Sequence, residues 1–159
     1  YTFDILSDYG SFRDLQRHRL MTIEWQKMNP ELGFNFPDEV KKTPYENECK
    51  ELITKSKELY EKLEANFPHL KEYSLLFGHN IRYSMTMNVR QAFHLIELRT
   101  AKQGHISYRK VCMKMHDQIK DIAGHSNFYE LMNFTDHEEY ELQRLDSEVK
   151  QAKKKENFN

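Results

Sequence analysis

Arginine and histidine side chains stand at two junctions where a helix and a strand are expected to meet. Arg17, His18 and Arg19 are consecutive, whereas Arg90 and His94 are four residues apart and share one face of a helix. Guanidinium groups bind phosphate in a forked geometry and stack on planar rings. Both groups could therefore bind an anion or a flat cofactor. Simpler interpretations stay open: the triplet can complement the negative end of a helix dipole, and the pair can be a solvated face.

Two further sets of residues could carry chemistry. Arg99 follows His94 on the same predicted helix, but about 100° of rotation per residue carries it round the cylinder, so it would act from the helix end. A metal site is a second possibility, raised by four residues at helical spacing: His105, Arg109, Cys112 and His116. Zinc sites usually take paired ligands from two elements, and Cys112 falls on an apolar face, so we predict no metal from this set.

In the central stretch of the chain, residues 81–109, the spacing of apolar residues changes from the two-residue period of a strand to the period of a helix. Residues 81–87 alternate between apolar and polar side chains, which predicts a half-buried strand. Asn88 is a good N-cap, and residues 89–101 then have helical spacing. The face expected to be buried carries Val89, Phe93 and Ile96.

The N-terminal part repeats this combination of strand and helix. Residues 1–6 predict a strand, and Ser7 or Asp8 can cap a short helix that ends in the arginine and histidine triplet. Residues 20–28 alternate again and predict a second strand next to the first. Asn29 and Pro30 end it. The inward positions are Phe12 and Leu15 on the helix and Met21, Ile23 and Trp25 on the strand.

The rest of the chain is predicted to form a loop followed by helices. Residues 31–44 form a loop that covers apolar surface with Phe34 and Phe36, and residues 45–66 form the longest helix. Residues 107–123 and 127–134 predict two more helices, and Asp136 would cap a last one, before a solvated lysine tail at 153–155. Their apolar faces carry Tyr45, Cys49, Leu52, Ile53, Leu59, Tyr60 and Leu63, then Tyr108, Val111, Cys112, Met115, Ile119 and Ile122, and finally Leu142, Leu145, Val149 and Ala152.

These elements predict an α+β fold, a small antiparallel or mixed sheet packed with five or six helices, because strands and helices do not alternate regularly. The 159 residues suit a single domain over 1–159. A net charge of −1 favours neither nucleic acid nor an anionic membrane as partner, and no apolar run could span a bilayer. We expect a cytoplasmic protein with two buried free thiols, Cys49 and Cys112. Because the chain begins at Tyr1, we expect it to be part of a longer one.

With both basic groups in view, the sequence resembles the flavin-dependent thymidylate synthase family, which methylates dUMP using methylenetetrahydrofolate and FAD. The triplet resembles the family's RHR signature. The segment MTMNVRQAFHLIELR, residues 85–99, resembles its strand followed by N-A-R and an aromatic-rich helix that closes in L-R. The resemblance covers most of residues 1–122, and the family's N-terminal portion is missing.

The resemblance implies roles for particular residues. Arg17, His18 and Arg19 match the triplet that holds FAD, and Arg90 and His94 match helix positions that line the flavin. Another match, Arg99, corresponds to the arginine that lies against the pyrimidine of dUMP. A guanidinium beside the uracil carbonyl would stabilise the negative charge that develops when the ring accepts a nucleophile, which is a catalytic role.

The sequence also departs from the family's pattern. Where the family has a serine followed by Gly and Arg in its dUMP pocket, this chain has Lys27, Met28 and Asn29. Lys27 can still meet a phosphate, but the forked arginine is gone. Asp14 replaces a glutamine before the triplet and so adds a negative charge. Glu72 falls near an expected arginine and so reverses the charge there.

Three hypotheses follow from this resemblance. In the first, the chain is an active synthase domain that binds dUMP through Lys27 and Arg99, with FAD and folate as further ligands. In the second, which the lost serine motif and the missing N-terminal portion favour, it is a degenerate structural or regulatory half that pairs with a second family domain. A flavin or nucleotide binder with a changed reaction is the third, for which no residue gives specific support. Family members assemble as tetramers with sites built from several chains, so the resemblance implies an oligomer.

Overall fold

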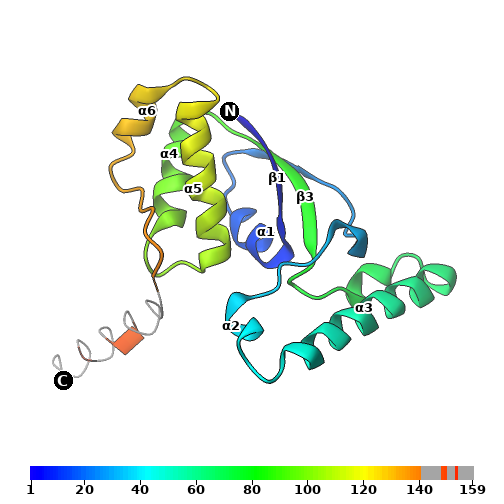
Figure 1. Ribbon diagram of the computed structural model, residues 1–159. Coiled ribbons are helices and arrows are strands. Elements are labelled where there is room, and N and C mark those ends of the chain that lie inside the picture. Colours follow the sequence, from blue (N-terminus) through cyan, green and yellow to red (C-terminus); the bar gives the residue numbers. More distant parts are fainter. Residues whose placement is uncertain (141–147, 150–152, 154–159) are drawn as a thin grey trace. The chain divides into compact units, whose positions relative to one another are not determined.

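The computed structural model describes residues 1–140 together with 148, 149 and 153. Within it the chain forms two compact units. One is Thr2–Thr86, and the other is Tyr1 with the chain from Met87 onward. The first holds the sheet and the longest helix, whereas the second is helical (Figure 1). The α+β class that the sequence predicts is confirmed.

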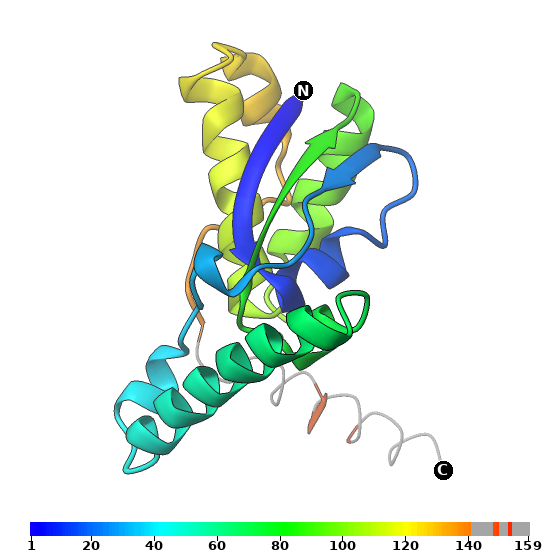
Figure 2. The same cartoon turned by 90° about the vertical axis from the view of Figure 1, so that its right-hand side faces the viewer.

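The sheet unit contains three antiparallel strands: β1 (Thr2–Asp8), β2 (Thr22–Trp25) and β3 (Asn80–Thr86). Their order is β1-β3-β2, and Figure 2 shows β3 between the other two. The prediction that the second strand lies next to the first is wrong. Alternate side chains of β3 are buried on a long apolar face, which suits the centre, whereas β2 has only four residues and suits an edge.

Helix α1 (Tyr9–Leu15) connects β1 to β2. Asp8 caps it, because its carboxylate accepts hydrogen bonds from the backbone N–H of Ser11 at 2.8 Å and from the Ser11 hydroxyl at 2.8 Å. Phe12 and Leu15 are buried as predicted. The helix ends at Leu15, however, so the basic triplet lies in the turn after the helix and not in its last turn.

The predicted loop after β2 contains short elements, η1 (Pro30–Leu32) and α2 (Asp38–Lys41). Phe34 forms an isolated bridge with His79 and packs its ring against it, with centroids 5.0 Å apart. A Cβ at Gly78 would collide with the Phe34 ring, so glycine is required there. The loop covers apolar surface as expected, and α2 is the part that the sequence interpretation missed.

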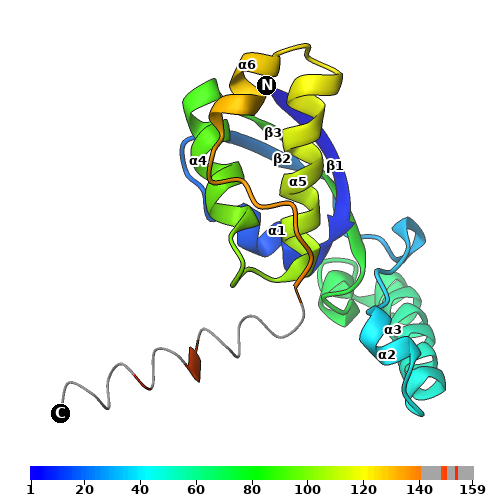
Figure 3. The ribbon, with the colours of Figure 1, turned by 60° about the vertical axis from the view of Figure 1, so that its left-hand side comes forward.

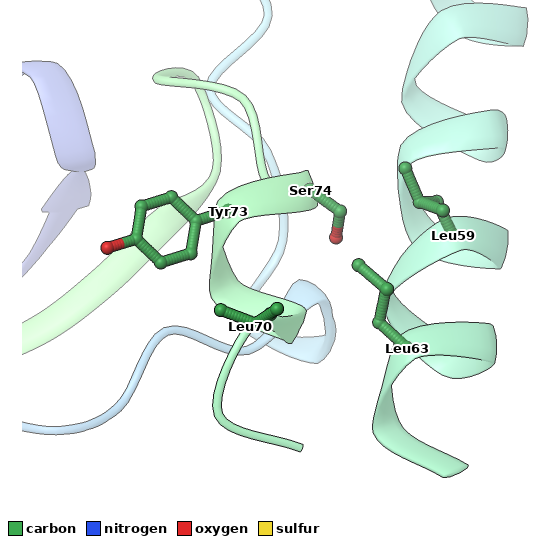
Figure 4. A pocket seen from close by; sticks show the side chains of 5 residues that line it. All are labelled: Leu59, Leu63, Leu70, Tyr73 and Ser74. Carbon is green, nitrogen blue, oxygen red and sulfur yellow. The ribbon is translucent and has the colours of Figure 1, made fainter. Parts of the chain in front are cut away.

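The longest helix, α3 (Glu46–Asn66), is confirmed, but most of its predicted apolar face is not buried. Its buried residues are Ser56 and Tyr60, while the side chains of Leu52 and Leu59 are 53% and 47% exposed. The η2 turn (Lys71–Ser74) lies beside it, and the Ser56 hydroxyl donates to the Ser74 carbonyl at 2.6 Å. One short turn is too small to cover a helix of this length. A shallow apolar groove is left, lined by Leu59, Leu63, Leu70, Tyr73 and Ser74 (Figure 4).

The helical unit consists of α4 (Val89–Thr100), α5 (Ile106–Asp121) and α6 (Ser126–Leu131), and Figure 3 shows α4 and α5 side by side. Asn88 caps α4 as predicted, because its side-chain oxygen accepts from the Gln91 N–H at 2.9 Å. The buried face of α4 is rotated from the predicted one. Instead of Val89 and Phe93, which are half-buried, the fully buried apolar residues are Ala92, Leu95 and Ile96.

The predicted face of α5 is largely correct. Cys112, Met115 and Ile119 are buried, but Ile122 is 77% exposed because the helix ends at Asp121. Of the last predicted helix, Val149 is exposed, whereas Leu142, Leu145 and Ala152 lie outside the described residues, as do Lys154 and Lys155. No helix among the described residues is long and apolar enough to cross a membrane.

Candidate functional site

The basic triplet lies in the turn between α1 and β2. Arg17 and Arg19 are exposed and His18 is half-buried. Arg17 is paired with Asp14, with a guanidinium nitrogen 3.2 Å from a carboxylate oxygen. The turn itself is held by the His18 N–H, which donates to the Leu15 carbonyl at 3.2 Å. Its forked donors are therefore accessible to an anion, but the carboxylate of Asp14 competes for Arg17.

The segment that departs from the family's serine motif is anchored on the protein interior. Lys27 is exposed, whereas Met28 is buried. The Met28 N–H donates to a Glu72 carboxylate oxygen at 3.4 Å, and the Met28 carbonyl accepts from the Tyr60 hydroxyl at 3.3 Å. Two departures that are far apart in the sequence therefore lie in contact. An apolar side chain and a carboxylate therefore occupy this place, and the Nζ of Lys71 lies 4.9 Å from the centroid of the Tyr60 ring beside it.

Arg90 and His94 share the exposed side of α4, as the four-residue spacing predicts. The buried side of the same helix carries Leu95 and Ile96, each with no exposed surface. The N-cap and this buried side fix the rotation of α4. The two side chains therefore project from a rigid element into solvent, where a large ligand could reach both.

Arg99 lies in the last turn of α4 and is half-buried. Its guanidinium carbon is 5.6 Å from the centroid of the Tyr108 ring, a cation–π distance that orients the fork. Burial raises the pKa of the neighbouring Cys112 thiol to about 12, and the positive charge of Arg99 acts in the opposite direction. Cys112 is therefore protonated at neutral pH and is not a thiolate nucleophile.

The predicted site residues fall on two compact units. Arg17, His18, Arg19 and Lys27 belong to the sheet unit, whereas the three cationic positions of α4 belong to the helical unit. Within the sheet unit the triplet precedes β2 and Lys27 follows it, so these positions lie at opposite ends of that strand. A ligand that needs both would have to be long.

The four residues considered as a metal set do not form one. His105 caps α5, because its Nδ1 accepts from the Ser107 N–H at 3.3 Å, and Cys112 is buried and protonated. Arg109 is buried and donates to the carbonyls of Thr100 at 2.8 Å and Glu138 at 2.9 Å. Arg109 therefore joins the end of α4 to the chain after α6.

His116, the fourth member, lies instead beside Asp117 and His137, with ligand atoms that all fall within 4.8 Å of one another. Sequence reasoning missed this cluster. His137 is 21 residues from His116 and no periodic pattern connects them.

A family model described as thymidylate synthase complementing protein, Thy1, matches residues 1–125. The chain belongs to this family. It is the family of flavin-dependent thymidylate synthases that the two basic motifs predict, and the match includes every residue to which a role was assigned. His137 lies beyond its end.

The chain is also similar to three curated relatives. The chain is 36% identical over 148 residues to a UPF0159 protein of Chlamydia muridarum, covering 93% of this chain and 28% of the relative. It is 34% identical over 151 residues to a UPF0159 protein of Chlamydia pneumoniae, covering 94% and 28%. A UPF0159 protein of Thermoplasma acidophilum is 30% identical over 152 residues, covering 94% and 30%. The chain thus spans less than a third of the length of these relatives.

Among solved structures, the fold matches the crystal structure of the UMP/dUMP methylase PolB from Streptomyces cacaoi bound with 5-Br UMP. The TM-score is 0.67 with 14% sequence identity, over 84% of this chain and 75% of that chain. At this identity the likeness establishes the fold. It confirms the α+β architecture that the sequence resemblance predicts.

Proposed function

We propose that this chain is a thymidylate synthase-type domain that binds FAD and contributes to the methylation of a pyrimidine nucleotide, dUMP in the first place. The observation that carries the proposal is the family membership together with the family's cationic positions. Arg17, Arg19 and Arg90 are present in the sequence and exposed in the structure. The structural likeness to a UMP/dUMP methylase supports the same substrate class.

The residues present fit the flavin. A dinucleotide carries two phosphates and a flat ring system, and exposed guanidinium groups offer forked donors for the first and stacking partners for the second. In the proposal Arg17, His18 and Arg19 of the sheet unit bind FAD, and Arg90 and His94 of the helical unit line a flavin, in the same chain or in another copy of it. When bound, FAD supplies the reducing electrons of the family's reaction. The side chains of this chain bind and orient it.

For the pyrimidine, the proposal relies on Arg99. The Tyr108 ring holds the guanidinium near the end of α4, where it can donate to a uracil carbonyl and stabilise negative charge on that oxygen. Because the geometry depends on a fork, Arg99→Lys should weaken dUMP binding while flavin retention stays unchanged. Lys102→Arg, a charge-conserving change at an exposed lysine that follows α4, is the control.

A second candidate function has an observation of its own. The contact between Met28 and Glu72 fills the place of the family's phosphate-binding motif with an apolar side chain and an acid. This favours a domain that no longer methylates and supports a catalytic partner. If the domain is active, Lys27 makes the phosphate contact with dUMP. If the domain is a structural half, Lys27 binds no ligand.

The exposed face of α3 supports pairing with another copy of the chain or with a second family domain. Leu52, Leu59 and Tyr73 are exposed together near the groove of Figure 4, and the relatives are more than three times as long as the matched region. Large exposed apolar patches usually mark interaction surfaces. The single-domain interpretation of residues 1–159 and the cytoplasmic location both stay predictions.

The test of the proposed function is a visible absorption spectrum of the purified chain after loading with FAD and removal of the excess, followed by titration with dUMP. Stoichiometric flavin whose band shifts with dUMP is the expected result. Lys27→Ala should then weaken the dUMP response, and added salt should weaken it further, because a single exposed cation is screened. Chain that retains no flavin would refute the proposal and favour the structural half.

A further inference from the structure

His116 is held in one orientation by its burial and by two contacts with Tyr129 in the helical unit. Its side chain is 4% exposed. Its ring stacks on the ring of Tyr129, with centroids 3.9 Å apart and planes 11° from parallel. Its Nε2 lies 3.0 Å from the Tyr129 backbone oxygen. A buried imidazole with so little freedom is preorganised at its other nitrogen, Nδ1.

The hydrogen bonds determine which nitrogen of His116 has a lone pair to offer. A carbonyl oxygen can only accept, so Nε2 carries the hydrogen. In the neutral ring Nδ1 is then an acceptor, and it faces Nε2 of His137 at 2.8 Å. The neutral ring is the form in which imidazole binds a metal ion.

A carboxylate completes the cluster. Nε2 of His137 lies 3.9 Å from a carboxylate oxygen of Asp117, the neighbour of His116 on α5. A second carboxylate, Glu97, accepts from the Phe134 N–H at 3.2 Å and contributes negative potential at His116. Two imidazoles and an acid from two chain segments therefore converge in negative surroundings.

From this geometry we propose that His116, His137 and Asp117 bind a divalent transition metal ion, with Zn²⁺ as the closest fit. Two ligands of a tetrahedral zinc ion lie about 3.3–3.5 Å apart, because each is about 2.0–2.1 Å from the metal. The distance from His116 Nδ1 to His137 Nε2 is 2.8 Å, and the distance from His137 Nε2 to the Asp117 carboxylate oxygen is 3.9 Å. These two distances lie on either side of that range. His137 and Asp117 are partly exposed and can adjust, whereas His116 stays fixed.

The protons balance without a further reactant. The ion takes the lone pairs of His116 Nδ1 and His137 Nε2, so the hydrogen on His137 Nε2 leaves that nitrogen and the ring carries its hydrogen on Nδ1 instead. His116 keeps its hydrogen on Nε2 and donates it to the Tyr129 carbonyl, the arrangement that usually orients a metal-bound histidine. A bound ion would fasten the segment around His137 to α5.

This site is independent of the proposed flavin and nucleotide functions. His137 lies outside residues 1–125, the part that the family model matches, and none of the three ligands is among the residues assigned to FAD or dUMP. The four residues first considered as a metal set, His105, Arg109, Cys112 and His116, all lie at or next to one helix. The structure supplies the second element.

The experiment is equilibrium dialysis of the full chain without an affinity tag against Zn²⁺, in the presence of excess Mg²⁺, with the bound metal counted. The expected result is one Zn²⁺ per chain and a midpoint of thermal unfolding that rises with free Zn²⁺. His137→Ala and Asp117→Asn change exposed groups and should each weaken Zn²⁺ binding at least tenfold. Co²⁺ should bind in its place with a visible spectrum that His137→Ala abolishes.

The matched control is His69→Ala, which removes an exposed histidine from the sheet unit and should leave both the stoichiometry and the affinity unchanged. Failure of the wild-type chain to retain Zn²⁺ would overturn the proposal and leave a hydrogen-bonded histidine pair. Equal affinity of wild type and His137→Ala would do the same. Neither result depends on flavin binding, so this test and that of the proposed function can fail separately.

Discussion

The apolar stripes of α3 and α5 are similar in sequence and different in the structure. On α5 the stripe is covered, and Cys112 and Ile119 have no exposed surface. On α3 the stripe is partly bare, with Leu52 and Leu59 about half exposed. Helical spacing tells which side of a helix is apolar, but the neighbouring elements decide whether that side is buried. Within the part of the chain that the structure describes, the neighbours of α3 therefore cover only part of its stripe.

The cationic groups differ in the same way. On α4 the predicted pair lies on the exposed side of a capped helix, supported by buried leucine and isoleucine. In the sheet unit the triplet lies in a turn, next to an acid that pairs with Arg17. The pair on α4 lies on a rigid helix. The ability of the triplet to bind an anion depends instead on how far the neighbouring acid neutralises Arg17. Five predictions test or sharpen this contrast between the units.

The largest effect is expected from Arg17→Ala combined with Arg19→Ala. If the triplet holds FAD, the double variant should lose stoichiometric flavin while its circular dichroism spectrum is unchanged, because both side chains are exposed. The measurement is flavin absorbance per chain after gel filtration. Lys55→Ala with Lys62→Ala makes the same charge change on α3 and should retain flavin. Unchanged flavin in the arginine double variant would remove the triplet from the site.

Stability distinguishes a buried position of the helical unit from the partly exposed stripe of α3. Leu95→Ala on α4 opens a cavity at a fully buried position and should lower the free energy of unfolding by about 2–5 kcal/mol. Leu59→Ala on α3 should change it by less than about 0.5 kcal/mol, because nearly half of that side chain is exposed. Urea unfolding measures both.

The same leucine variant tests association. If the α3 groove pairs with another copy of the chain, the Leu59→Ala variant should sediment at high concentration with a lower apparent mass than the wild-type chain. A large loss of stability for Leu59→Ala at low concentration, where the chain is monomeric, would contradict the exposed stripe.

The buried histidine of the sheet unit predicts a pH dependence. Burial lowers the pKa of His79 below the ordinary value of 6.5. The unfolded chain therefore binds more protons than the folded one, and stability should fall as pH decreases from about 6.5 through the lowered pKa. His79→Gln should flatten this slope in thermal unfolding followed against pH, whereas His69→Ala, at an exposed position, should keep it. A slope that is the same in wild type and His79→Gln would refute this assignment.

The smallest effect concerns Asp14, whose carboxylate pairs with Arg17. Asp14→Asn should raise FAD affinity by up to about fivefold, because exposed ion pairs contribute about 0.2–1 kcal/mol. Flavin fluorescence titration measures the change. Asp38→Asn removes the Lys41 pair, which has the same three-residue spacing, and should leave FAD affinity unchanged. Weaker binding by Asp14→Asn would show that the acid supports the site.

The sequence by itself determined the family, the α+β class and the cap of α4, and it gave Asp8 as one of two candidate caps of α1. RHR and the segment at 85–99 were sufficient for the first, and the family model confirms it. Asp8 and Asn88 cap the helices as predicted, because a cap depends on residues three positions apart. Local spacing also placed Arg90 and His94 on one exposed face.

Only the tertiary structure decided which distant residues meet. It placed β3 between β1 and β2, brought Glu72 to the Met28 segment, and set His137 against His116. Among the described residues it also left the α3 stripe partly exposed. The periodicity of a sequence indicates on which side of its own helix or strand a residue lies. Contacts across tens of residues depend on how the elements pack, and no local pattern encodes them.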